Sequence, residues 1–271
     1  MATSAVYAFV VGPFPLTTSH VLKLLAQSSL TALRLPVRGI ILGYVTTIAE
    51  YWNKGNNVEP WCRIAMSIMD WSRYSESREE VLWRTLITNR SGQRCPAPKD
   101  LQNSFRDFLI AMLAEELHLA SADGPDFESF WNERRAYKSF CRSGSLDVAQ
   151  DKVYDVEYYL SQPTDVRISA LRFYQHAIAC QSILHSAEIF EKSWEIPGGR
   201  LFTTSSGHLG LAPKSTMERD LVCVLQGARI PFIVRPADDH GYKLVGEAYV
   251  HRIMHGEVAD LGLPLEELFL E

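Results

Sequence analysis

The chain has 271 residues, of which 46% are hydrophobic and 22% charged, as in ordinary globular proteins. Its net charge of −5 comes without the lysine and arginine clusters that phosphate backbones attract, so we expect no nucleic acid partner. No stretch approaches the roughly 20 apolar residues of a membrane span. Five cysteines without a CxxC pair indicate neither a disulfide framework nor a zinc knuckle, so we expect a reducing, cytoplasmic environment.

The first fifty residues contain two extended candidates. Residues 5–11 form an apolar run that no basic residue precedes and that Pro13 and Pro15 follow, which favours a strand or ordered arm over a signal peptide. Residues 33–48 are rich in β-branched side chains, and Pro36 and Gly39 break any helical period. We therefore expect a strand or hairpin there.

Helical patterns dominate from residue 61 to about 193. In residues 61–74, four apolar side chains recur at helical spacing and predict a buried face: Trp61, Ala65, Ile68 and Met69. Ser77 stands three residues before Glu80, the spacing of a capping box, and predicts a helix that ends near Asn89. The most regular pattern follows from residue 101, with a buried face predicted at Leu101, Phe105, Leu109 and Met112. Residues 126–142 and 167–192 predict two further helices.

The pattern changes after residue 196. Short apolar runs at 201–204, 221–225, 231–235 and 242–250 are separated by glycine, proline and aspartate turns, which is typical of a compact antiparallel meander. The predicted class is therefore α+β. We expect a mainly helical body with an early strand or hairpin over 1–195, and a β-rich module over 196–271 packed on it as one unit.

Several segments resemble a known family. "GRLFTTSSGHLGLAP", "DLVCVLQGARIPFIVRP" and "YKLVGEAYVHRIMHGE", together with "VLWRTLITNR" upstream, resemble the C-terminal region of fungal heterokaryon-incompatibility (HET) domain proteins. The resemblance extends from about residue 33. Such proteins begin with an effector domain that is similar to a Toll/interleukin-receptor fold and triggers cell death. Residues 1–32 are too short to hold that domain, so we expect the C-terminal region alone.

Two positions depart from the family pattern. Arg219 stands before Asp220, and Arg252 follows "YVH", where the family usually has glycine. A side chain excludes backbone conformations that only glycine reaches cheaply. We therefore expect these turns to differ from those of the family.

The stretch "YKLVGEAYVHRIMHGE" allows two interpretations. Strand alternation places Glu247, Tyr249 and His251 on one face, which could line a pocket. Alternatively, the polar residues form a structural network in which Glu247 and Glu257 pair with arginines such as Arg84 or Arg235.

Other chemistry has weaker support. His251, His255 and Glu257 are too loosely spaced for a metal site. Ser206 lies near His208, but without the strand–turn–helix context of a nucleophile elbow. The glycine pairs lack the spacing of a phosphate loop, so we expect neither a metal nor a cofactor.

Stand-alone relatives of this kind resemble small proteins of fungal natural-product pathways, among which a HET-like protein acts as a norbornene-forming Diels–Alderase. The resemblance thus implies a cofactor-independent cyclase, an intramolecular Diels–Alder pericyclase acting on an apolar terpenoid or polyketide. Donors would come from Arg84, Arg235, Tyr249 or His251, and walls from Trp61, Trp71 and Trp83, although tryptophans also fill ordinary cores. The alternative is a non-enzymatic HET-derived recognition or protein-interaction module.

Overall fold

The computed structural model describes residues 34–49, 58–123, 139–140, 181–192, 199–237 and 241–271. The arm predicted at 5–11 lies outside these residues, as do nearly all of the helix predicted at 126–142 and the first part of the one at 167–192. Helices and strands are both present, so the α+β class is confirmed. The chain divides into a β unit, Met1–Tyr51 with Gly198–Glu271, and a helical unit, Trp52–Pro197.

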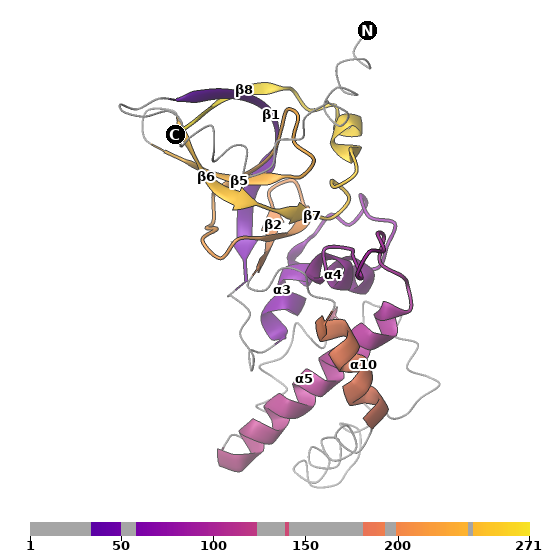
Figure 1. Cartoon of the computed structure of the whole chain (residues 1–271). Coiled ribbons are helices and arrows are strands. Elements are labelled where there is room, and N and C mark those ends of the chain that lie inside the picture. The colour runs from indigo at the N-terminus through magenta and orange to yellow at the C-terminus, as the bar shows by residue number, and fades with distance from the viewer. Residues whose placement is uncertain (1–33, 50–57, 124–138, 141–180, 193–198, 238–240) are drawn as a thin grey trace. The chain divides into compact units, whose positions relative to one another are not determined.

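The β unit is built around one long strand, β1 (Leu35–Ile48), which pairs antiparallel with three others. Because β1 pairs with both β4 and β8, the order β1-β4-β5-β6-β8 closes into a small barrel (Figure 1), and β2, β3 and β7 continue the sheet from the far end of β1. The other strands are β2 (Arg200–Thr204), β3 (Leu209–Ala212), β4 (Leu221–Leu225), β5 (Phe232–Pro236), β6 (Tyr242–Glu247), β7 (Tyr249–Val250) and β8 (Glu266–Leu270).

This topology differs from the predicted meander. The early strand was assigned to the helical body, whereas the sheet of the β unit incorporates it. The prediction also missed β3 and β8, and β8 pairs parallel with β6 at Tyr242 and Leu270. Closure by β1 removes the open edges that a free meander would expose.

A bend in β1 allows one strand to serve both parts of the sheet. The register with β4 shifts between Ile41 and Gly43, and Gly43 has a φ of +135°. A Cβ atom at this position would lie 2.7 Å from Ser205 Oγ in the β2–β3 turn. Glycine is therefore required at position 43 for two reasons. It adopts this unusual backbone conformation, and it leaves room for the β2–β3 turn, which a side chain would obstruct.

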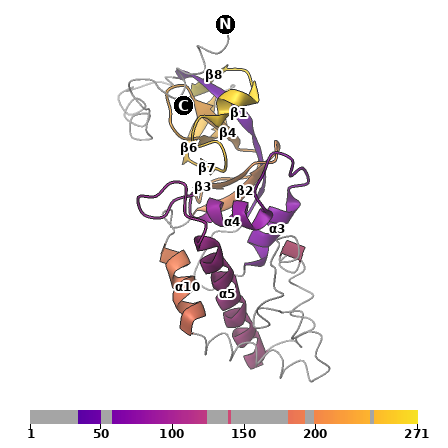
Figure 2. The ribbon, with the colours of Figure 1, turned by 90° about the vertical axis from the view of Figure 1, so that its right-hand side faces the viewer.

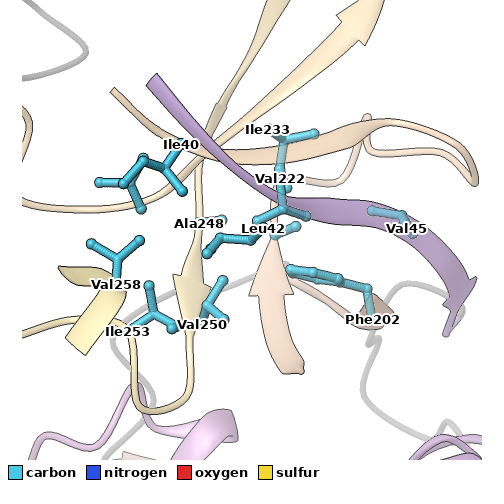
Figure 3. Packing of buried hydrophobic residues seen from close by; sticks show 12 residues of the cluster. Ile40, Leu42, Val45, Phe202, Val222, Ile233, Ala248, Val250, Ile253 and Val258 are labelled. Carbon is cyan, nitrogen blue, oxygen red and sulfur yellow. The ribbon is translucent and has the colours of Figure 1, made fainter. Parts of the chain in front are cut away.

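Two apolar clusters fill the β unit. One receives side chains from all five barrel strands and forms the barrel interior: Cys223, Leu225, Ala228, Phe232, Val234, Leu268 and Leu270, with Val37, Ile41, Tyr242 and Leu244 beside them. The second lies on the opposite face of β1, β4 and β5, where Figure 3 shows Phe202, Val250, Ile253 and Val258 packed against the strands. The barrel is therefore filled by its own side chains rather than hollow.

The helical unit consists of α3 (Glu59–Ser67), α4 (Arg78–Leu86), α5 (Leu101–Asp123) and α10 (Gln181–Lys192) in its described part. Helices α5 and α10 lie side by side (Figure 2), and Phe190 of α10 meets Phe105 and Phe108 at ring distances of 5.1 and 5.5 Å. Trp61 of α3 stacks on Phe108 at 6.4 Å. None of the described helices combines the length and the apolar character required to cross a bilayer.

Two of the predictions for the helices, the cap at Ser77 and the buried face of α5, are confirmed, and one at Met69 is wrong. Ser77 Oγ accepts a hydrogen bond from the backbone N–H of Glu80 at 3.1 Å, so the capping interaction is confirmed. The predicted face of α5 is buried as well. Met69 was predicted to be buried but is 92% exposed, because α3 ends at Ser67 and the helical period stops there.

Candidate functional site

Two arginines of the β unit occupy left-handed backbone conformations. Asp220 N–H donates to Met217 O, and Ile253 N–H donates to Val250 O, so each pair closes a four-residue turn. The third residues of these turns, Arg219 and Arg252, have φ values of 70° and 65°. Both arginines thus adopt the left-handed conformation that glycine reaches most easily, because the preference for glycine is an energy difference and not a prohibition. The expected difference from the family's turns stays a prediction.

The Arg219 turn is held by an ion pair between the buried Asp220 and the half-buried Arg235. Arg235 Nε and its terminal nitrogen donate to the two oxygens of Asp220 at 2.8 and 2.9 Å, and the same nitrogen reaches Ser215 O at 2.6 Å. The hydrogen bonds to Asp220 raise the pKa of Arg235. Asp220 is 2% exposed and also accepts the N–H of Met217 at 2.8 Å. Arg235 thus fixes this loop, and its role as a substrate donor stays a prediction.

Tyr249 and His251 form a buried polar pair. Tyr249 Oη and His251 Nδ1 are 3.0 Å apart, and the two residues are 4% and 2% exposed. Val250, between them, belongs to the apolar cluster of Figure 3, so the pair occupies the other face of the strand. Their neighbours in the register are Leu211, opposite Tyr249, and Leu209, whose carbonyl accepts the N–H of His251. A hydrogen-bonding pair thus lies among apolar neighbours.

The arginine partners predicted for the two glutamates are engaged elsewhere. Arg235 binds Asp220, and Arg84 belongs to the helical unit. Glu257 accepts the backbone N–H of His255 at 2.7 Å, and Glu247 is exposed. Within the described ranges, no three potential metal-ligating side chains gather into one group.

Ser206 and His208 lie in hydrogen-bond contact in the β2–β3 turn, at 2.9 Å between Oγ and Nδ1. Ser206 Oγ also donates to the carbonyl oxygen of Leu42. The bond to Leu42 O ties the β2–β3 turn to β1, so Ser206 has a structural role here.

Arg84 and the three tryptophans belong to the helical unit. Arg84 is 7% exposed and donates to Glu80, to Asn89 Oδ1 and to Ala97 O, so it holds the loop after α4. Trp61 and Trp83 are 4% and 0% exposed and belong to the buried core. Trp71 is half-buried, and its indole N–H donates to Glu76 O at 2.9 Å.

The predicted site residues are therefore divided between the two units. Arg84 and the tryptophans belong to the helical unit, and Arg235, Tyr249, His251, Glu247 and Glu257 to the β unit. The sequence prediction missed the Asp220–Arg235 pair and the exposed Tyr44 beside it. Asp220 directly precedes a strongly apolar strand, which was the available signal, whereas no local pattern distinguishes Tyr44 from its buried neighbours on β1.

These features define a small, filled β-barrel in one unit of the chain and a helical second unit. The family model that matches is the Het-6 beta-barrel domain, over residues 73–270, and the chain belongs to this family. The resemblance found in the sequence is thereby confirmed.

One curated relative is heterokaryon incompatibility protein 6, OR allele, of Neurospora crassa, with 37% identity over 84 residues. That alignment includes 28% of this chain and 12% of the relative, so the chain spans a small part of its length. No solved structure matches the chain.

Proposed function

We propose that this chain is a non-enzymatic recognition module of the heterokaryon-incompatibility type, which binds a protein partner through the outer surface of its barrel. The observation that carries the proposal is the filled barrel interior, to which all five strands contribute apolar side chains. A filled barrel offers its outer surface and loops for binding rather than a central cavity.

The polar contacts support the same role. Arg84 and Arg235, which an enzyme would need as free donors, are both engaged: Arg84 pairs with Glu80 within α4 and holds the following loop through Asn89 and Ala97, and Arg235 pairs with Asp220. Rigid loops reduce the entropy lost when a partner binds. In addition, Tyr44 and Met217 of the β unit are 49% and 56% exposed, and both residue types are enriched at protein interfaces.

The proposal is tested by inducing the whole chain in Neurospora crassa strains that differ in their incompatibility alleles. We expect growth to stop in some strains and to continue in others, because recognition depends on the partner. The variant Phe202→Asp, which places a charge in the apolar cluster, serves as the unfolded control. Equal growth of all strains expressing the folded chain would contradict the proposal.

A second candidate is the cofactor-independent cyclase of Diels–Alder type, which the Tyr249–His251 pair favours. A hydroxyl held by an imidazole among apolar neighbours could donate to a dienophile carbonyl, while an apolar site folds the substrate into its reactive conformer. Such chemistry requires neither a metal nor a nucleotide.

His251→Ala distinguishes the two functions. In a cyclase, the variant slows conversion of a linear diene–dienophile substrate about 10- to 100-fold with little loss of stability. In a recognition module, the free energy of unfolding falls by about 1–3 kcal/mol because Tyr249 loses a buried partner. The rate and the product ratio of the purified wild-type chain, compared with buffer alone, show whether any conversion depends on the protein.

A further inference from the structure

Three exposed side chains lie together where β1 meets the turn before β4: Tyr44, Met217 and Arg219. We call this set the corner surface. The backbones are joined by two hydrogen bonds, from Arg219 N–H to Val45 O and from Val45 N–H to Asp220 O, both 2.8 Å. Tyr44 directly precedes Val45, so its side chain emerges beside the turn.

The corner surface is rigid. Asp220 accepts bonds from Arg235 and from the Met217 backbone, and Arg200 donates to Thr216 O at 3.0 Å. On the other side, Tyr44 N–H donates to Ser205 Oγ at 3.2 Å, and Ser205 N–H donates to Tyr44 O at 2.8 Å. The exposed side chains therefore project from a backbone that is tied on both sides.

The backbone conformation of Arg219 is energetically unfavourable. Its left-handed backbone costs a side-chain-bearing residue about 1 kcal/mol more than glycine. Its side chain is exposed and, among the described residues, forms no ion pair that would offset this cost. An exposed residue held in a strained conformation without a compensating contact is therefore the outlier from which we infer a role for Arg219 in contacting a partner.

The charge of the loop indicates the kind of partner. The segment 214–219 carries Lys214 and Arg219 against Glu218, all exposed, so its net charge is +1, in a chain whose total is −5. Asp220 and Arg235 compensate each other. A tyrosine, a methionine and an arginine on a locally basic loop are complementary to an acidic segment that bears apolar side chains.

We propose that the corner surface is the partner-contact site of this module and binds an acidic protein segment carrying an apolar side chain. This inference rests on the recognition function proposed above and identifies its surface and partner class. Arg219 would pair with a carboxylate, while Tyr44 and Met217 cover the apolar side chain.

The test uses fluorescence anisotropy with the whole chain and two labelled peptides. The two peptides have leucine and phenylalanine at the same positions. All remaining positions are glutamate in one peptide and lysine in the other. We expect the acidic peptide alone to bind, more weakly as salt is added. Arg219→Gly should weaken binding about five- to thirtyfold, as for an interface hot spot, without lowering the melting temperature, and Tyr44→Ala should also weaken it.

The control is Arg229→Gly, which removes the same charge from another exposed turn of the β unit and should leave binding unchanged. Equal loss in both variants would show nonspecific attraction and overturn the proposal, as would binding of the basic peptide or no binding of the acidic one. If the wild-type chain forms a concentration-dependent dimer and the Arg219→Gly variant stays monomeric, the surface binds a second copy of the chain and the proposed acidic partner is wrong. None of these results depends on growth arrest. The binding test can therefore disprove the corner surface as the contact site without disproving the recognition function.

Discussion

At the scale of the residue, Arg219 and Arg252 hold left-handed backbone conformations in two tight turns of the β unit. Glycine is favoured in the third position of such turns because it lacks a Cβ atom, and its absence suggested a different turn. The cost of a side chain there, about 1 kcal/mol, is comparable to the net contribution of the hydrogen bond that closes each turn. The surrounding strands therefore impose the conformation, and the arginines accept it.

Replacing either arginine by glycine should therefore stabilise the chain. We expect Arg219→Gly and Arg252→Gly each to raise the free energy of unfolding by about 0.5–1 kcal/mol, since relief of the left-handed strain exceeds the added entropy of the unfolded glycine. Urea denaturation measures the change. Arg229→Gly, where φ is not positive, should be neutral or destabilising, and a loss of stability in the first two variants would contradict the backbone assignment.

At the scale of the element, local patterns were predictable and distant pairings were not. The cap at Ser77, the buried face of α5 and strand β4 follow from spacings within a few residues. The closure of β1 against β4 and β8 joins segments about 180 to 230 residues apart, and no local period encodes a partner at that distance. The sequence named Arg235 as a polar candidate but not its partner Asp220, because the two residues meet only through the pairing of β4 with β5.

The bend in β1 depends on one residue. Gly43→Ala should lower the free energy of unfolding by about 2–3 kcal/mol, because alanine is strained at a φ of +135° and its Cβ would meet Ser205 Oγ at 2.7 Å. Denaturation monitored by circular dichroism checks this value. Gly92→Ala, at a φ of +56° that other residues also reach and with open space around the Cβ position, combines milder strain with no crowding and should cost less. Equal costs would contradict the strain and crowding assigned to Gly43.

The barrel interior can be tested through its cysteine. Burial raises the pKa of Cys223 to about 12, so at pH 8 only about one thiol in ten thousand is ionised, and the thiolate is the reactive form. Cys95 is exposed. Iodoacetamide at pH 8 followed by peptide mass spectrometry should modify Cys95 in the folded chain and Cys223 only after denaturation. Modification of Cys223 as fast as Cys95 would show an open barrel.

At the scale of the whole molecule, the family assignment and the filled barrel support recognition, with the corner surface as the contact site. At Arg219, stability and function have opposite requirements. Arg219→Gly should make the chain more stable and less able to bind. If Arg219 had only a structural role, its replacement would not raise stability while weakening binding.

The most direct measurement is therefore the growth of Neurospora crassa strains induced to express the wild-type chain, Arg219→Gly or Arg229→Gly, with protein amounts matched by immunoblot. We expect the wild-type chain and Arg229→Gly to arrest the same strains, and Arg219→Gly to leave those strains growing despite its equal or greater stability. Arrest by all three proteins alike would contradict the corner surface, and growth of every strain with all three would contradict the recognition function itself.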